Sequence, residues 1–457
     1  QSTYIFKHAL TREVVYNSLL LKKRTEIHEK IAKSIEGLHQ DRLEEFYEMI
    51  AYQYSMSGNI RKAYEYLKLS AKKATRSHSM WEALNFYRKA IEKLKELPST
   101  EENKREHIEL IKTAEGPIRL LGYPEDSLTI LKQGESLAEE LGDKSAIAQL
   151  SNAIGLCHTS SGDPLLAARY HERCFEEATN LGDIELMAQT ARVLCLSYLS
   201  SGELRKIGGI APSVSDLLEK THQEHEFFGG PICVYAVIQS LYGIYMGGVL
   251  GNFSKGEQLL ERVLSLAVEI NEPYTLGAIE WGCGIFYVWK GDSENIIKHC
   301  DNCIGQFEKA ESTLWLGQAW SAAGYGYYLS GKPQRALECI EKGLIIQNDV
   351  GTPMWLSSHY LYRGLIHLSE NNLSVAQSDV EMALELSKRN KERLFECMSR
   401  IWLGRVIGKM AKGRVSQGEK STVRGIEILK ELQLKPRYAE GYLVLGELLA
   451  EAGRISE

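Results

Sequence analysis

Residues 320–343 read WSAAGYGYYLSGKPQRALECIEKG, and this stretch decides the fold. Trp320, Gly324 and Tyr327 are four and three residues apart, which places all three on one face of a helix. A small residue such as Gly324 lets two helices approach closely, and aromatic side chains fill the space beside it. Gly331 then marks a polar turn before a second amphipathic segment. The stretch therefore predicts two packed helices joined by a short turn.

The turn at Gly331 recurs along the chain at a nearly constant interval. The steps are 40 residues except for one of 49 and one of 42, and the equivalent positions are Gly122, Gly162, Gly202, Gly251, Gly291, Asn371, Gly413 and Gly453. A second set of breaks lies between these turns, at 141–143, 181–183, 272–273, 312–313, 351–353 and 435–436. Only 10 prolines occur in 457 residues, which leaves room for long helices. Two helices per period explain both sets of breaks.

This pattern resembles the tetratricopeptide (TPR) signature, W-x2-L-G-x2-Y followed by A-x3-F. The resemblance extends over roughly residues 46–457, and residues 320–343 match it most closely. It implies an all-α fold, a TPR-like α–α superhelix in which antiparallel helix pairs stack as a solenoid. The chain departs from the family in its period of 40 rather than 34 residues and in the mostly missing terminal proline of the motif. Longer helices, as in the TPR-like arrays of large signalling ATPases, would account for the extra residues.

The periodicity divides the chain into three predicted parts. Residues 1–45 do not fit the period and are expected to form a helical junction, and residues 46–98 are expected to form the first TPR-like hairpins. Residues 99–457 are expected to form a solenoid of about eight repeats, with an irregular insertion near 205–232 where the 49-residue step falls. The chain starts without Met and ends within the repeat pattern, so we expect it to be a fragment of a longer protein.

The N-terminal part carries a second resemblance. It is similar to the segment after the ATPase module in bacterial proteins that join a class III adenylate or guanylate cyclase, or another output domain, to a STAND-type ATPase and a TPR array. The matching residues are Phe6-Lys7-His8-Ala9-Leu10, Tyr16, Leu19-Leu20, Arg24 and His28, followed by residues 51–74. The resemblance implies that residues 1–45 contact an ATPase or output domain, and that ATP and Mg belong to that parent. A simple helical cap on the array is the alternative interpretation.

The composition limits the partners and the compartment. A net charge of −6 and a pI of about 6.1 argue against a nucleic-acid partner, which usually requires a basic excess. The sequence contains no apolar run long enough for a membrane span, so we expect no membrane contact. Nine cysteines, an odd number without a framework spacing, indicate thiols in a reducing cytoplasm.

Two segments imitate chemical sites. His299-Cys300-x-x-Cys303 has the spacing of half a zinc site, but no second pair lies near it, and the repeat assigns both cysteines to packing positions. Residues 413–421, GRVSQGEKS, imitate a phosphate-binding loop, but Glu419 separates the second glycine from Lys420. The dispersed histidines and acids suggest no catalytic triad or dyad. We therefore expect no catalytic, cofactor-binding or metal-binding residues in this segment, and no enzymatic activity.

Aromatic residues are dense between 274 and 362. Most of them must form the core, but the first helices of a solenoid line its concave face, where aromatic side chains can anchor a protein or peptide partner. The predicted partner-binding groove comprises Trp281, Trp289, Trp315, Tyr328, Trp355 and Tyr362.

Three functions are compatible with these observations. The first is a regulatory, protein-binding arm of a cytoplasmic signalling ATPase, in particular one that carries an adenylate or guanylate cyclase. The second is a free-standing TPR adaptor or scaffold. The third is the sensor arm of a STAND-type transcription activator.

Overall fold

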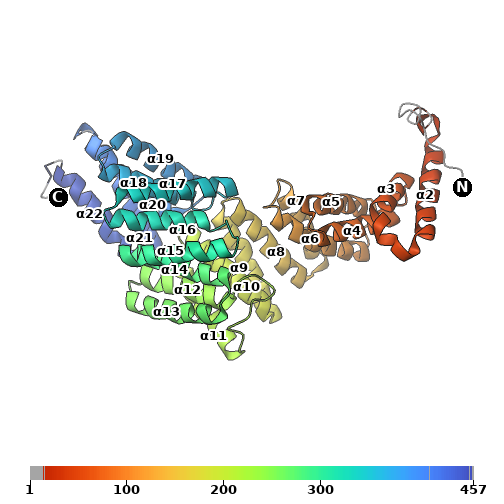
Figure 1. Ribbon diagram of the computed structural model, residues 1–457, viewed down its shortest axis with the longest axis horizontal. Coiled ribbons are helices and arrows are strands. Elements are labelled where there is room, and N and C mark those ends of the chain that lie inside the picture. The colour runs from red at the N-terminus through yellow and green to blue at the C-terminus, as the bar shows by residue number, and fades with distance from the viewer. Residues whose placement is uncertain (1–13, 15, 411, 452, 455–457) are drawn as a thin grey trace. The chain divides into compact units, whose positions relative to one another are not determined.

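The computed structural model describes residues 14, 16–410, 412–451 and 453–454, and helices make up nearly all of them (Figure 1). No strand occurs in this part of the chain. The contacts divide the chain into two compact units, Gln1–Ile154 and Gly155–Glu457. The predicted all-α, TPR-like array is therefore confirmed, whereas the predicted division into 1–45, 46–98 and 99–457 stays a prediction.

The first unit is a series of helices in which each packs on the next, from α2 to α7. The phenol groups of Tyr54 and Tyr66 donate hydrogen bonds of 2.5 and 2.6 Å to the two carboxylate oxygens of Glu36, which joins three helices at one point. The elements are α2 Leu21–Leu38, η1 Gln40–Phe46, α3 Tyr47–Ser57, α4 Ile60–Arg76, α5 Met80–Lys95, α6 Glu101–Leu120 and α7 Ser127–Leu141, and α8 Lys144–Ser160 contains the division between the units.

The described residues of the N-terminal motif form a local network. The Tyr16 hydroxyl lies 2.9 Å from Nε2 of His28, whose Nδ1 lies 2.6 Å from the side-chain oxygen of Gln53. The Arg24 guanidinium donates to the carbonyl of Leu19 and lies over the Tyr16 ring at 4.9 Å. Through the contact of His28 with Gln53, these motif residues hold α2 against α3. Phe6–Leu10 of the same motif lie outside the described residues.

The second unit contains most of the 40-residue helix pairs. Its elements are α9 Pro164–Leu181, α10 Ile184–Ser201, η2 Leu204–Lys206, α11 Ile207–Lys220, α12 Val234–Gly248, α13 Phe253–Ile270, α14 Pro273–Lys290, α15 Ser293–Lys309, α16 Leu316–Leu329, α17 Pro333–Val350, α18 Leu356–Ser369, α19 Leu373–Arg389, α20 Arg393–Met410, η3 Lys412–Arg414, α21 Val415–Leu432 and α22 Lys435–Glu451. The insertion expected near 205–232 holds η2, α11 and the non-helical residues that follow α11.

Glycine–aspartate turns explain why the helices end where they do. Gly162 and Gly291 both adopt a left-handed φ of +77°, a conformation that costs glycine little and that ends a helix. The next residue then caps the following helix, because its carboxylate accepts a backbone N–H, as Asp163 does from Leu166. The alternation of these turns produces the short connections that the repeat predicted.

The curvature of the second unit brings distant repeats together. The first helices of successive pairs contact one another, and α10 also contacts α20 while α12 contacts α22. A Cβ atom on Gly162 would lie 2.9 Å from the ring of Pro353, and one on Gly202 would lie 3.1 Å from Leu432. The second unit therefore completes a superhelical turn in which the turns of early repeats pack against those of late repeats.

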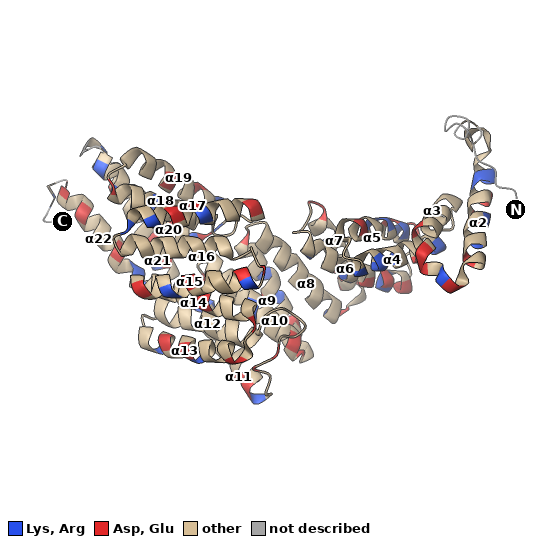
Figure 2. Cartoon of the chain, in the orientation of Figure 1, with Lys and Arg blue, Asp and Glu red and all other residues tan. Residues whose placement is uncertain are grey.

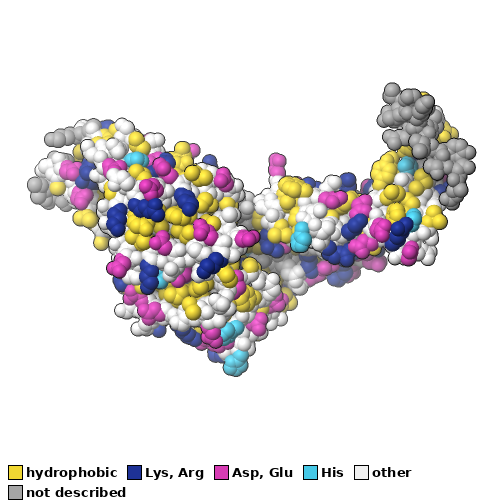
Figure 3. Space-filling view, in the orientation of Figure 1, with side chains coloured by type: hydrophobic (Ala, Val, Ile, Leu, Met, Phe, Trp, Pro, Cys, Tyr) yellow, Lys and Arg dark blue, Asp and Glu magenta, His cyan; other side chains and the backbone are white. Residues whose placement is uncertain are grey.

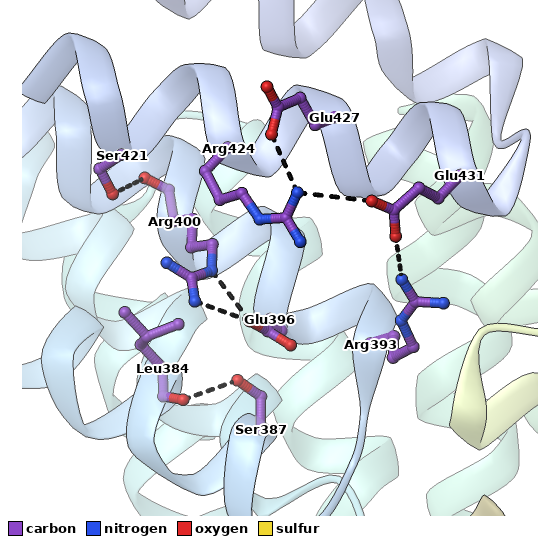
Figure 4. A network of polar contacts seen from close by, with 9 residues as sticks. All are labelled: Leu384, Ser387, Arg393, Glu396, Arg400, Ser421, Arg424, Glu427 and Glu431. Atoms are coloured by element: carbon purple, nitrogen blue, oxygen red, sulfur yellow. Dashed lines mark hydrogen bonds and ion pairs between the residues drawn. The ribbon is translucent and has the colours of Figure 1, made fainter.

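Charged side chains of both signs are interspersed over the helices (Figures 2 and 3). On α20 and α21, Glu431 accepts from Arg393 and from Arg424, and Arg424 also donates to Glu427 (Figure 4). Arg400 pairs with Glu396 within α20. Because exposed pairs of this kind contribute little to stability, the fold depends on the apolar core instead.

Candidate binding site

An apolar pocket lies in the second unit, between helices that are each the first of a helix pair. Its walls come from α10, α14, α16, α18, α20 and α22, and its empty volume is about 820 Å³, including space open to solvent. Aromatic rings dominate the walls, contributed mainly by Trp281, Trp289, Tyr325, Trp355, Tyr362 and Trp402. Burial raises the pKa of Tyr362 to about 12, so its phenol is uncharged at neutral pH. A concave, largely apolar pocket with few polar groups is the usual form of a binding site.

Two of the lining tryptophans, Trp281 and Trp355, form a packed cluster with Trp315, which lies behind them. The rings of Trp281 and Trp355 are stacked at 5.3 Å with an angle of 8°, and Trp315 is tilted against both at 5.5 and 5.9 Å. Trp281 and Trp355 are 7% and 5% exposed, so most of their surface is already in contact with protein. The cluster is therefore a rigid wall, because each ring restrains the other two.

A buried carboxylate fixes the backbone of this wall. Trp355 precedes α18 with a left-handed φ of +57°, and its N–H donates to Glu392 Oε1 at 2.6 Å. The hydroxyl of Ser357 donates to the other oxygen of Glu392. Burial raises the pKa of Glu392 to about 8. Glu392 thus positions the Trp355 ring from the neighbouring helix pair.

A charged pair from α22 forms the opposite wall. Arg437 Nη1 donates to Glu440 at 2.8 Å, Nη2 donates to the carbonyl of Val288 at 3.3 Å, and the guanidinium lies over the Trp289 ring at 4.9 Å. The second oxygen of Glu440 accepts from Trp402 Nε1 at 3.1 Å. The Val288 carbonyl belongs to the last turn of α14, where carbonyls lack a helical donor and favour a cation. Arg437 therefore joins the last helix of the unit to α14.

The structure brings four of the six predicted groove residues into this pocket: Trp281, Trp289, Trp355 and Tyr362. Trp315 packs behind the lining, where its Nε1 donates to the Tyr274 hydroxyl at 3.2 Å. The assignment of these residues to partner binding stays a prediction.

The sixth predicted residue, Tyr328, lies near the end of α16 beside Tyr325, with the two rings 6.0 Å apart, and it is not among the lining residues. Its neighbour Tyr325 is, and it stacks on Tyr362 at 4.5 Å. On α16 the pocket is therefore lined by Tyr325 rather than by the predicted Tyr328, whose assignment to partner binding stays a prediction.

The predicted groove omitted other lining residues, among them Phe395, Trp402, Arg437 and Glu440. The 40-residue period contained a signal for two of them. Phe395 follows Trp355 by 40 residues, and Trp402 follows Tyr362 by the same interval. Arg437 and Glu440 had no such signal, because their role depends on α22 reaching α14.

The segments that imitate chemical sites can be located in the structure. All nine cysteines are buried, and no group of three or more metal-binding side chains occurs among the described residues. His299 Nδ1 lies 2.5 Å from Glu280, whose other oxygen accepts from Asn302, so the histidine beside the CxxC has a protein partner. Residues 413–421 pass from η3 into α21, without the preceding strand that a phosphate-binding loop needs. None of the described helices is both long and apolar enough to span a membrane.

Comparison with solved structures identifies the same fold in two Rap proteins. A Rap protein complexed with Competence and Sporulation Factor matches with a TM-score of 0.52 and 14% identity, over 86% of this chain and 99% of that chain. The Rap conjugation gene regulator of plasmid pLS20, in complex with the Phr* peptide, matches with a TM-score of 0.52 and 14% identity, over 78% and 96%. At this identity the likeness establishes the fold alone.

A more distant match is the STAND protein with a tetratricopeptide repeat sensor from Pyrococcus horikoshii, with a TM-score of 0.41 and 12% identity over 73% of this chain and 52% of that chain. A likeness at this level carries no argument about the parent protein. No protein-family model matches the chain, and no curated protein matches it. The chain thus has the fold of TPR-like superhelical proteins.

Proposed function

We propose that this chain is a protein-interaction arm whose second unit receives a segment of a partner on its inner surface. The observation that carries the proposal is the aromatic pocket, because tryptophan and tyrosine side chains in a concave apolar site are the usual anchors of a protein partner. The charges of the pocket walls cancel, which suits a peptide segment better than a nucleic acid. The Phr* peptide bound to the pLS20 regulator shows that this fold can receive a peptide.

A peptide library displayed against the whole purified chain tests the proposal. We expect selected peptides to compete with one another for one site and to change the tryptophan emission. Five of the seven tryptophans, namely Trp281, Trp289, Trp315, Trp355 and Trp402, line the pocket or pack against its lining, so emission reports on it directly. If no peptide is enriched over an empty support, the chain is not a peptide-binding arm of this kind.

We further propose that the arm serves a cytoplasmic signalling ATPase of the STAND type, with a nucleotide cyclase as the output domain. The motivating observation is the N-terminal motif, together with the exposed apolar side chains beside it: Leu20 is 81% and Leu21 75% exposed at the start of α2. Apolar surface of this kind favours contact with another protein domain. Sequencing the reading frame upstream of Gln1 tests the proposal, and a frame without an ATPase module would favour the free-standing adaptor.

A further inference from the structure

The charged side chains in the pocket lining sum to no net charge. Arg437 and Glu440 are the charged residues of its lining, and they pair at 2.8 Å while Trp402 donates to the same carboxylate. A charged ligand group would have to leave water and compete with this pair, and burying an unpaired charge is costly. The group that enters the pocket is therefore uncharged.

The aromatic faces of the pocket are also occupied. Arg437 covers Trp289 at 4.9 Å, and the rings of Trp281 and Trp355 cover one another at 5.3 Å. A cationic ligand needs an open aromatic face for a cation–π contact. The remaining edges of these rings, together with Leu361 and Met398, instead offer dispersion contacts to an apolar group.

Two hydrogen-bond donors in the pocket walls lack acceptors. Trp281 Nε1 and Arg437 Nε are shielded from solvent and have no hydrogen-bond partner among the described residues, and Trp281 is 7% exposed. A buried donor without an acceptor is destabilising, so a carbonyl oxygen that reaches either donor would gain a partner at little cost. A peptide main chain presents a carbonyl next to every side chain.

Helix α22 packs mainly on α20 and α21. Arg437 joins it to α14, because its guanidinium donates to the Val288 carbonyl at 3.3 Å and lies over the Trp289 ring. The pocket is thus closed by a side chain from the last helix pair.

From these observations we infer that the pocket binds one large uncharged apolar side chain of a peptide segment, with an adjacent main-chain carbonyl at Trp281 or at Arg437, and that α22 closes over it. The inference rests on the proposed function, which supplies the peptide. It adds the chemical class of the anchor and identifies Arg437 as the residue that closes the site.

Scanning a selected peptide against the unmodified chain tests the anchor. Each position is replaced in turn by Ala, Leu, Asp and Lys, and the dissociation constant is measured by fluorescence or calorimetry. We expect one position at which Leu is tolerated and at which Asp or Lys weakens binding by about tenfold or more, which corresponds to the cost of burying a charge. A peptide in which Asp or Lys is tolerated at every position overturns the inference, although peptide binding itself would then support the proposed function.

A matched pair of variants tests the location. Ser358 lies in the pocket lining and is 3% exposed, whereas Ser374 is exposed on α19. Ser358→Leu fills part of the pocket and is expected to weaken peptide binding by about tenfold or more, and Ser374→Leu is expected to leave it unchanged. Circular dichroism and the unfolding midpoint show whether each variant is folded. If folded Ser358→Leu binds as tightly as Ser374→Leu, the pocket is not the site; if no peptide binds the unmodified chain, the proposed function fails as well.

Discussion

The carboxylate of Glu392 accepts the backbone N–H of Trp355 at 2.6 Å and thereby holds a bulky residue in the left-handed conformation, with φ at +57°. This conformation costs a non-glycine residue about 1–3 kcal/mol and persists only where its surroundings enforce it. The two residues belong to neighbouring helix pairs, at the start of α20 and of α18. The orientation of one pocket wall therefore depends on the contact between two repeats.

Protonation of Glu392 should make the stability of the chain depend on pH. Burial raises its pKa from an ordinary value near 4.5 to about 8. Between these values the folded chain holds a proton that the unfolded chain releases, so this group's contribution to the free energy of unfolding falls as pH rises. Glu392→Gln keeps an acceptor for Trp355 without an ionisable group. We expect its stability relative to the unmodified chain to be higher at about pH 8 than at about pH 5.5, measured by urea unfolding.

The control for this prediction is Glu385→Gln, because Glu385 is an exposed glutamate on α19. Its effect on the unfolding free energy should be the same at both pH values. If Glu392→Gln behaves like this control, the carboxyl of Glu392 does not titrate in this range and is in contact with water in solution.

Closure of the superhelical turn can be tested with two glycines of the same backbone conformation. Gly162 and Gly291 both have φ of +77°, but a Cβ on Gly162 would lie 2.9 Å from Pro353, whereas one on Gly291 would meet nothing within 4 Å. Gly291→Ala should lower the unfolding free energy by about 1–2 kcal/mol through backbone strain alone. Gly162→Ala should cost about 1–3 kcal/mol more, because it also forces two repeats apart. Equal losses would show that these repeats do not touch in solution.

The positions of the turns were predictable because each one is encoded locally. Gly122, Gly251 and Gly331 adopt left-handed backbones at the predicted places, and Asn371 does the same with φ of +61°. Gly413 is the exception, since η3 occupies the connection there and the step to this turn is 42 rather than 40 residues. The local chemistry of glycine and asparagine was therefore sufficient to divide most of the chain into helix pairs.

The contacts that build the pocket could not be predicted in the same way. Small rotations between successive repeats accumulate into the superhelix, so a minor error per repeat displaces α22 far from α14. For this reason the sequence indicated that Trp281 and Trp355 occur in first helices, but not that their rings stack or that Arg437 reaches Val288. The periodic signal at Trp402 was available, whereas the contacts of Arg437 with Val288 and Trp289 were apparent only from the structure.

The cysteines should be unreactive in the folded chain. All nine are buried, and burial raises the pKa of the Cys300 and Cys397 thiols well above the ordinary value. Because the thiolate is the reactive form, both access and ionisation oppose modification. All nine thiols of the denatured chain should react with a chromogenic disulfide at about pH 8. In the same time, we expect less than one thiol per folded chain to react. Rapid labelling of several thiols without denaturant would contradict the packing of these helices.

The pairing of Arg437 with Glu440 should contribute more to stability than an exposed pair of the same chemistry. The two side chains are 15% and 23% exposed, and removing one partner leaves the other partly buried without its counter-charge. We expect Arg437→Met and Glu440→Leu each to lower the unfolding free energy by about 2–3 kcal/mol. The double variant should lose clearly less unfolding free energy than the two single variants lose together, because it leaves neither charge unpaired.

Arg424 and Glu427 provide the matched comparison, since they have the same i,i+3 spacing on α21 but are 49% and 53% exposed (Figure 4). Arg424→Met and Glu427→Leu should change the unfolding free energy little and additively, because water screens both charges. A coupling between Arg437 and Glu440 no larger than that of this exposed pair would mean that α22 does not cover the pocket in solution. A larger coupling, accompanied by a change in Trp289 emission in Arg437→Met, would place the guanidinium where the structure has it, between the last helix pair and α14.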